Sequence, residues 1–433
     1  MNGQPSVPLL EALPLPSSTE PSWLSTRRQA AAEALRAHGL PTHKDEAWRF
    51  TPLDAIVGAS FARATLEQPS PAALGTDPSR ALQIVDGRPE LEGFAIPEGI
   101  ELRSLRDLLR EDPARLEPLL GGLSSGTHFA GLNAALFEDG LLMRISAQAS
   151  SLAPLRIEHR CAPRSERRVS YPRMLILVEE GAEASLVETF LGPEGPAGSD
   201  ASGSLRASVT EIFLAAGSRL EHVRLSLNPS LEIAELSVQQ ARSSHYASRS
   251  FALGGALDRL DLRVHLEGEG AECLLEGAYH ASAHERVDNH LRVEHRAPHC
   301  TSHQRYRGVL DGNGLAVFDG LSIVAPNAQR SEAHQENRNL LLSDEARVHT
   351  KPHLEIEADD VSCSHGATVG ALDEEPLFYL RARGIGAREA RDILIYAFLR
   401  SIVDRVQDEP TREQLAEAFL GRLPHGEVIG DLR

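Results

Sequence analysis

The spacing of hydrophobic positions changes twice along the chain. Up to about residue 140 they recur at intervals of three and four, as in amphipathic helices. One helix is predicted over residues 21–38, with Gly39 as its C-terminal stop. A leucine stripe over residues 102–109, interrupted at Pro113, predicts a second. Residues 1–140 are therefore expected to form an N-terminal helical region that begins with a flexible leader.

From residue 141 to 371 the pattern changes to short segments of alternating polarity, such as those at 174–178 and 184–191. Turn signals separate these segments and recur in similar form at 180–182, 216–218, 254–256, 269–271 and 312–314. A sandwich, a barrel and a solenoid all fit such a run of strands, and the imperfect repetition favours a β-helix. Helical regions on both sides would cover the ends of a solenoid.

The helical spacing returns after Leu372. One helix is predicted around residues 377–380 and a longer one over 390–402, with Gly384 and Gly386 between them. A last helix is predicted to start at Thr411, where a glutamine three residues later completes a capping box. Residues 372–433 are therefore expected to form a C-terminal helical domain.

Composition narrows the class of protein. Hydrophobic residues make up 41% of the 433 residues and charged residues 24%, which is typical of a globular chain. A formal net charge of -18 argues against nucleic acid or an anionic membrane as a partner. The arginine-rich run over residues 156–173 is interpreted as a solvated face without a role.

The sequence also predicts where the protein is located and whether its cysteines are reduced. Neither a secretory leader nor an apolar run of about 18 residues is recognisable, so a cytoplasmic location is expected. The four cysteines form no CxxC pair, which argues against a disulfide framework and an all-cysteine zinc site. We expect reduced thiols.

The segment 351–386 has the clearest chemical potential. In an extended strand Leu354 and Ile356 would face the core, while His353 and Glu355 would face solvent. If the strand continued, residues 363 and 365 would lie on this polar face as well. The acidic pair at 359–360 is a plausible bend that would break this parity.

Cys363 and His365 are candidate metal ligands. Their α-carbons would lie roughly 7 Å apart in a strand. A thiolate and an imidazole suit iron, zinc or copper, but a closed site normally needs four donors, so other ligands would have to come from elsewhere. The alternative, that each is an ordinary packed or solvated residue, stays open.

Other candidate sites are less convincing. His295, His299 and His303 would share one strand parity, but Pro298 interrupts the strand, and surface or core-polar histidines are preferred. The chain has no GxGxxG, GxxxxGK[ST] or HExxH motif. Ser124 lies in a GxSxG match that follows a helical stripe instead of a strand, so a loop residue is predicted.

Several segments resemble the SufB/SufD family of iron-sulfur cluster assembly scaffolds. The family's signature region is similar to SEAHQENRNLLLSDEA (331–346) and to the sequence KPHLEIEADDVSCSHGATVGALDEEPLFYLRARGI that starts at Lys351. Supporting matches are KDEAWRFTPL (44–53), FAGLNAALFEDG (129–140), and HRAPHCTSHQRYRGVLDG leading to VFDG (317–320). Gly366 stands where SufB-type chains typically have glutamate, which favours the SufD-type branch.

The resemblance implies a right-handed parallel β-helix between helical domains. It also implies a scaffold without catalytic turnover, which pairs with SufB and binds the ATPase SufC. His365 would help to hold a nascent iron-sulfur cluster or iron at the SufB interface, with Cys363 as a second candidate. The cluster would be transient and shared with SufB, so none is expected stably on the isolated chain. Whether a flavin binds the complex is left open.

The surface for SufC is expected on the C-terminal helices, where an apolar stripe exceeds what a lone helix needs for packing. Its candidate residues are Leu377, Phe378, Tyr379, Leu380, Ile393, Leu394 and Phe398. Trp48 is interpreted as a packing anchor. Two other hypotheses remain: a homodimeric iron-binding or delivery module that acts without SufB, and a β-helix enzyme that acts on polysaccharide.

Overall fold

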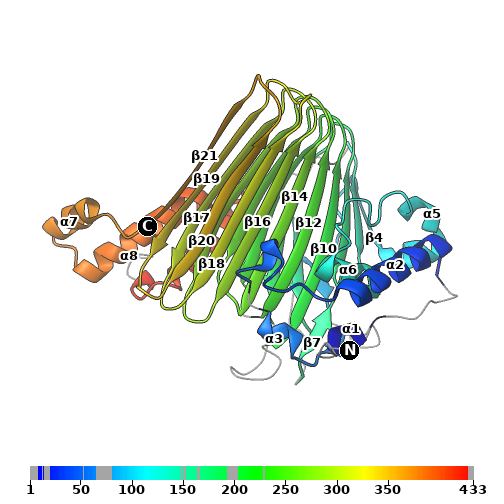
Figure 1. Ribbon diagram of the computed structural model, residues 1–433, viewed down its shortest axis with the longest axis horizontal. Coiled ribbons are helices and arrows are strands. Elements are labelled where there is room, and N and C mark those ends of the chain that lie inside the picture. Colours follow the sequence, from blue (N-terminus) through cyan, green and yellow to red (C-terminus); the bar gives the residue numbers. More distant parts are fainter. Residues whose placement is uncertain are drawn as a thin grey trace.

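The protein is a parallel β-helix with helices at both ends of the chain (Figure 1), which confirms the predicted fold class. The computed structural model describes residues 8–11, 13, 20–51, 53–64, 80–147, 149, 153–162, 166–192, 203–227 and 230–427. From β8 onward, successive long strands alternate between two sheets, and each pairs in parallel with strands of neighbouring turns. Each pair of successive strands therefore makes one turn of the helix.

The first sheet is called sheet A. One of its edges is β20, in the last turn of the β-helix, and the other is β4, in the N-terminal part of the chain. Along its main path it consists of β20 (Arg347–Ile356), β18 (Leu315–Val324), β16 (Arg286–His295), β14 (Leu257–Leu266), β12 (Leu231–Gln240), β10 (Leu205–Leu214), β8 (Arg173–Val178), β5 (Leu141–Ile145) and β4 (Ile100–Ser104). Two short strands join it at the side, β7 (Arg168–Ser170) and β1 (Ala62–Arg63).

The second sheet, called sheet B, runs in the same order along the helix. It consists of β21 (Ser362–Gly370), β19 (Glu332–Leu341), β17 (Thr301–Leu310), β15 (Glu272–Ala281), β13 (His245–Ala252), β11 (Arg219–Leu227), β9 (Glu183–Leu191), β6 (Leu155–Arg160), β2 (Leu82–Val85) and β3 (Arg88–Glu90).

Apolar rows along the helix axis form most of the interior. Leu236, Leu262 and Leu291 lie in register on β12, β14 and β16, and all three are buried. Turns between the sheets use left-handed glycines, such as Gly181 and Gly217 with φ of 67° and 66°. Each row stays aligned in space although the turns differ in length, which explains why the sequence shows only loose repetition.

Helices from the N-terminal part cover the outer face of sheet A (Figure 1). They are α1 (Pro8–Glu11), α2 (Ser22–His38), η1 (Glu46–Trp48), α3 (Asp54–Val57), α4 (Leu105–Glu111), α5 (Pro113–Leu116) and α6 (His128–Leu136). Trp48 is 6% exposed within this apolar cluster, which confirms its role as a packing anchor.

The C-terminal helices α7 (Glu374–Ala382), α8 (Ala387–Val403) and α9 (Glu409–Leu420) follow the last strand. Helices α8 and α9 pack on the outer face of sheet B. The buried carboxylate of Glu276 on β15 receives guanidinium groups from Arg249, Arg305 and Arg405, at 3.2, 3.1 and 2.9 Å. Because Arg405 follows α8, this cluster ties the C-terminal helices to the β-helix.

Three local predictions were wrong. Leu102 belongs to β4 and not to a helix, and β1 to β4 show that residues before 141 also contribute strands to the sheets. Helix α9 is capped by Asp408, whose carboxylate accepts the backbone N–H of Thr411 at 2.9 Å. The arginine-rich run is only partly a solvated face: Arg167 is exposed, but Arg173 is buried against Glu211.

No helix in the described part of the chain is both long and apolar enough to cross a lipid bilayer.

Candidate functional site

The last turn of the β-helix, formed by β20 and β21, is an open end. Among the described strands, each of the two pairs along its length with only one neighbour, β18 or β19. Most of their residues are exposed, including the apolar Ile356 and Val369 at 44% and 47%. Long unpaired strands are templates for pairing with another chain. The open end therefore exposes backbone groups with which a further strand could pair.

Hydrogen bonds to β18 show which backbone groups of β20 are unpaired. The N–H of Arg347 bonds to Gly314 at 3.0 Å and that of Glu357 bonds to Val324 at 2.9 Å. Since residues of a parallel strand alternate between its two neighbours, the even-numbered residues of β20 direct their N–H and C=O groups to the open edge. Pro352 is one of these, so its missing N–H costs no bond to β18.

The same reasoning applies to β21. The N–H of Ser362 bonds to Ser331 at 3.0 Å, so the odd-numbered residues direct their backbone groups to the open edge. Cys363 and His365 are both odd-numbered. Their backbone groups are therefore available to a further strand.

The side chains of Cys363 and His365 lie on the inner side of β21. Cys363 is in register with Ala333 on β19, and His365 is in register with Gln335, both of which are buried in the interior. The two candidate ligands therefore share one side of the strand, at the uncovered mouth of the β-helix.

The prediction of which side chains of β20 and β21 point inward and which point outward is only partly correct. Leu354 and Ile356 point inward, in register with the buried Ser322 and Val324, as predicted. His353 and Glu355 alternate with them on the outer side, with side chains 50% and 53% exposed. Residues 363 and 365 do not share this outer face, because the chain bends at the acidic pair 359–360 between β20 and β21, the alternative that the sequence had left open.

The pair supplies two donors of different character. His365 is exposed and Cys363 is half-buried. Burial raises the pKa of the Cys363 thiol above its usual value, so the thiol is protonated near neutral pH until a metal or a cation displaces the proton. Within the described residues, no three His, Cys, Asp or Glu side chains converge as a metal site. A closed site at the mouth needs donors from outside this part of the chain.

Polar side chains line the interior beneath this mouth. The Gln304 amide donates to Ser322 Oγ at 3.1 Å, and the Gln335 amide lies 2.8 Å from the same oxygen. Closer to the other end of β19, Asn337 accepts a hydrogen bond from Thr350 at 2.9 Å. The apolar core thus gives way to a hydrogen-bonded amide and hydroxyl network near the open end.

The second histidine cluster does not converge on one site. His295 ends β16 inside the β-helix, with its Nε2 2.8 Å from Ser302 Oγ, and burial lowers its pKa to about 4. His303 lies on the outer face of sheet B and stacks on His334, with ring centroids 5.2 Å apart. A turn between β16 and β17 separates the two, which supports the structural interpretation.

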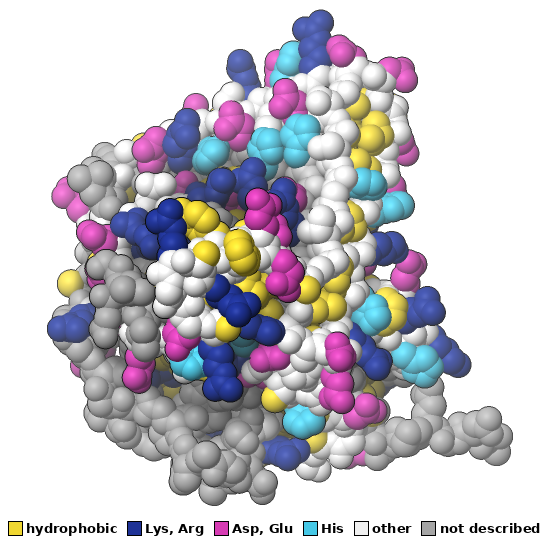
Figure 2. Space-filling model, turned by 90° about the vertical axis from the view of Figure 1, so that its left-hand side faces the viewer, with side chains coloured by type: hydrophobic (Ala, Val, Ile, Leu, Met, Phe, Trp, Pro, Cys, Tyr) yellow, Lys and Arg dark blue, Asp and Glu magenta, His cyan; other side chains and the backbone are white. Residues whose placement is uncertain are grey.

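Helix α7 carries the most exposed apolar side chains of the described chain. None of its residues is buried, and Phe378 and Tyr379 are 72% and 55% exposed. Leu377 and Leu380 are half-buried. On the face shown in Figure 2, hydrophobic side chains lie among histidine, basic and acidic ones, so an apolar contact there would have a charged surround.

On α8 the candidate residues are less exposed. Ile393 and Phe398 pack partly against the core between α8, α9 and sheet B, and Leu394 is half-buried. Of the predicted stripe, the part free to contact another protein is therefore mainly on α7.

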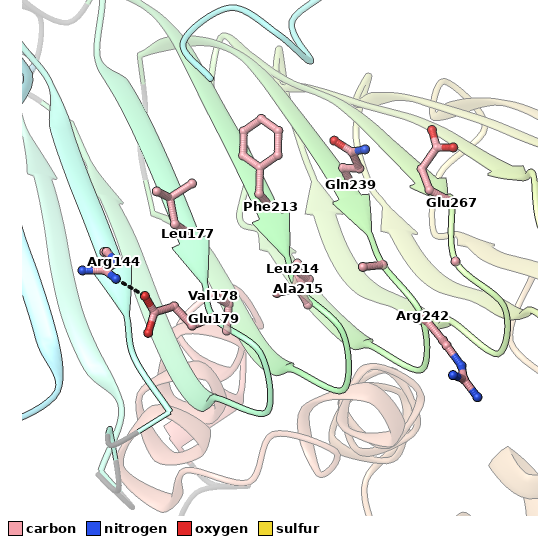
Figure 3. A pocket seen from close by; sticks show the side chains of 12 residues that line it. Arg144, Leu177, Val178, Glu179, Phe213, Leu214, Ala215, Gln239, Arg242 and Glu267 are labelled. Atoms are coloured by element: carbon pink, nitrogen blue, oxygen red, sulfur yellow. Dashed lines mark ion pairs between the residues drawn. The ribbon is translucent and has the colours of Figure 1, made fainter. Parts of the chain in front are cut away.

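A groove of about 550 Å³ on the outer face of sheet A offers no comparable chemistry (Figure 3). Leu177, Phe213 and Gln239 line its floor, and its Arg144 and Glu179 side chains form an ion pair with each other. Ser124 lies in a loop, as predicted, and its hydroxyl donates to Glu235 at 2.8 Å.

Comparison with known proteins agrees with this geometry. Residues 161–398 match the family model described as SUF system FeS cluster assembly, SufBD core domain. The iron-sulfur cluster assembly protein SufD of Escherichia coli is 32% identical over 412 residues, which cover 93% of this chain and 94% of that protein. The SufBD family protein slr0076 of Synechocystis is 30% identical, with 90% and 89% covered. Protein ABCI7 of Arabidopsis thaliana chloroplasts is 30% identical, with 94% and 87% covered.

The chain therefore belongs to the SufBD family of the SUF iron-sulfur cluster assembly system. The match to a SufD protein spans nearly the whole of both chains, which makes this chain an assembly protein of the SufD type.

Sequence reasoning missed the backbone of the open end as a functional feature. The signal was indirect: a proline stands inside the strand 347–356. Proline within a strand indicates an edge.

Proposed function

We propose that this chain is the SufD-type subunit of a cytoplasmic SUF complex that pairs with SufB and docks the ATPase SufC. The open end formed by β20 and β21 would receive the corresponding end of SufB, and the two ends would enclose a cavity between them. A nascent cluster, or its iron, is the cargo of this cavity. The chain itself would contribute binding and position, without catalytic turnover.

One observation carries this proposal: His365 and Cys363 lie on the inner side of the last strand, which pairs with β19 on one side and is open on the other among the described strands. A second β-helix that continued the sheets would place its own inward side chains directly above them, about 4.8 Å farther along the axis. Donors from both chains would then face one enclosed space. This explains how two ligands on this chain could become a complete site.

The test is anaerobic co-purification of the chain with SufB and SufC from the same organism. We expect His365→Ala to leave the complex assembled but to remove most of its cluster absorbance and bound iron. His353→Ala is the matched control, because His353 is similarly exposed but lies on the outer side of β20. Equal cluster content in both variants would contradict the role of His365. Cys363→Ser tests the thiol in the same way.

SufC would dock on α7. Phe378 and Tyr379 offer exposed aromatic surface of the kind that anchors protein interfaces. The ion-pair cluster around Glu276, which ties the C-terminal helices to sheet B through Arg405, would transmit motion of these helices to the β-helix. We expect Phe378→Ala with Tyr379→Ala to weaken SufC binding at least tenfold in a titration, while Ile96→Ala, exposed to 45% on the opposite end, has no effect. Unchanged SufC affinity would exclude α7.

A homodimer that handles iron without SufB is a second candidate, because the outward side chains of β20 are self-complementary. Arg347 stands at its start, and Glu355 and Glu357 stand at or just after its end. In an antiparallel pair of two β20 strands, these basic and acidic side chains would face each other across the two-fold axis.

A charge swap tests this candidate. Arg347→Glu should weaken self-association in sedimentation experiments, and adding Glu357→Arg to the same chain should restore it. A homodimer that is insensitive to both changes must use another surface.

A further inference from the structure

Residues 44–50, called here the strap, cross the outer face of sheet A. Arg259 on β14 fixes their position. Its guanidinium lies 3.7 Å from the centre of the Trp48 ring and donates to the Ala47 carbonyl at 2.9 Å. Arg259 is 1% exposed, and the Asp261 carboxylate holds it by two hydrogen bonds of 2.9 and 2.8 Å. The strap is thus anchored to the β-helix by a buried cation.

The strap reaches the open end of sheet A. The Phe50 ring stacks on His349 of β20, with centroids 3.8 Å apart and planes 9° apart. The Glu46 carboxylate is 2.7 Å from the ammonium group of Lys351, on the same strand. His349 and Lys351 both lie on the outer side of β20, in register with Val317 and Asp319.

These contacts cover only part of the Phe50 ring. It remains 41% exposed, one of the few large apolar side chains of the described chain that are so exposed. Burial lowers the pKa of His349, so this imidazole is neutral beneath the ring near neutral pH. The stack is therefore an apolar platform beside the unpaired edge.

We propose that the strap is part of the docking surface: Phe50 and Glu46 contact the outer side of the partner strand that pairs with β20. This inference rests on the proposed pairing of the open end with a second β-helix. Neighbouring strands lie about 4.8 Å apart, so outward side chains of the partner strand would stand next to His349 and Lys351. The Phe50 ring, which stacks on His349, and the Glu46 carboxylate, which pairs with Lys351, therefore lie within reach of the partner's side chains.

The occupant is the end of the partner β-helix, and its chemistry follows from the platform. An aliphatic or aromatic side chain would cover Phe50, and a basic side chain would approach Glu46. Aromatic side chains that are partly exposed in the free protein and become covered on binding carry a large share of interface affinity. The strap would thus add side-chain specificity to the backbone pairing that the edge provides.

The first experiment titrates the full-length chain with its SufB-type partner from the same organism and measures the dissociation constant by sedimentation. We expect Phe50→Ala to weaken binding about tenfold and Glu46→Gln, which is too exposed to affect folding, about threefold. Ile96→Ala is the matched control, an equally exposed apolar residue at the opposite end of the β-helix. Affinities of Phe50→Ala and Glu46→Gln equal to that of the wild type would overturn the inference.

Hydrogen exchange of the wild-type chain gives a second measurement that needs no variant. Amides of residues 44–50 should exchange more slowly in the complex than in the free chain. Unchanged exchange over the strap, with slowed exchange over β20, would overturn the inference while leaving the edge pairing intact.

Leu354→Pro separates this inference from the proposed function. The Leu354 N–H points to the open edge, so proline there removes a donor to the partner but none to β18. Glu355→Arg reverses an exposed charge on the outer side of the same strand. If Leu354→Pro and Glu355→Arg both leave binding of the partner unchanged, the proposed edge pairing itself fails. If they weaken binding and Phe50→Ala does not, only the role of the strap fails.

Discussion

The two ends of the β-helix differ in what terminates them. At the N-terminal end the last strands run antiparallel to their neighbours, with β3 beside β2 and β4 beside β5. The interior there is apolar, with Leu82, Ile84 and Ile157 all nearly or fully buried. At the C-terminal end β20 and β21 have no neighbour on one side within the described chain, and the interior beneath them is polar.

This difference shows that the described chain closes one end of the β-helix itself and leaves the other end open. An apolar interior exposed at an open end would promote aggregation. Amide and hydroxyl groups beneath the mouth tolerate water in the free chain. Variants placed at corresponding depths in the two ends test this difference.

The largest effect on stability is expected from Leu82→Ala at the closed end. Removing a fully buried leucine side chain should lower the free energy of unfolding by about 2–5 kcal/mol. Val369→Ala at the open end should cost less than about 1 kcal/mol, because nearly half of that side chain is already exposed. Urea unfolding of both variants measures the contrast, and equal losses would mean that the open end is buried in the free chain.

The next effect concerns pH. His295 is neutral in the folded interior with a pKa of about 4, below the value of about 6.5 expected when unfolded. The stability that depends on a neutral His295 is complete above pH 6.5 and is lost as the pH falls towards 4. The loss in the free energy of unfolding can reach about 3 kcal/mol. His295→Gln should therefore reduce the loss of stability between pH 7 and 4.5 in urea unfolding. His353→Gln, an exposed histidine, is the control and should not change it.

A smaller loss is expected within the polar interior. The Tyr279 hydroxyl donates to the Asn339 side chain, and both residues are buried. Tyr279→Phe leaves that amide oxygen without this donor, which should cost about 1–3 kcal/mol in unfolding free energy. A stabilising effect would mean that the network is not satisfied in the free chain.

The smallest effect should come from a charge at the open edge. Val369→Lys should change the unfolding free energy by less than about 0.5 kcal/mol, because the side chain is exposed. It should nevertheless reduce self-association in light scattering at high concentration, since lysine on an edge strand opposes pairing. Unchanged self-association would point to a surface other than β21.

Much of the fold could be predicted from local patterns. Alternation predicted a run of strands over 141–370, turn signals that contain glycine marked five of the connections between strands, and Gly39 marked the end of α2. The leucine stripe misled at Leu102, because the same residues that would line a helix also fit a half-buried strand at the edge of a sheet. The cap of α9 was missed because Asp408 and Thr411 both satisfy cap chemistry, and only packing decides between them.

From the sequence alone came the candidate ligands: the resemblance and the ligand types pointed to Cys363 and His365. The tertiary structure was needed to place these two on the inner side of an edge strand, since a turn of a few residues between β20 and β21 reverses the face that simple alternation predicts. It also brought the strap beside β20 from about 300 residues away, through contacts of Arg259 that leave no pattern in the local sequence. Local periodicity records how each strand meets the core, whereas the partners of a surface depend on contacts between distant segments.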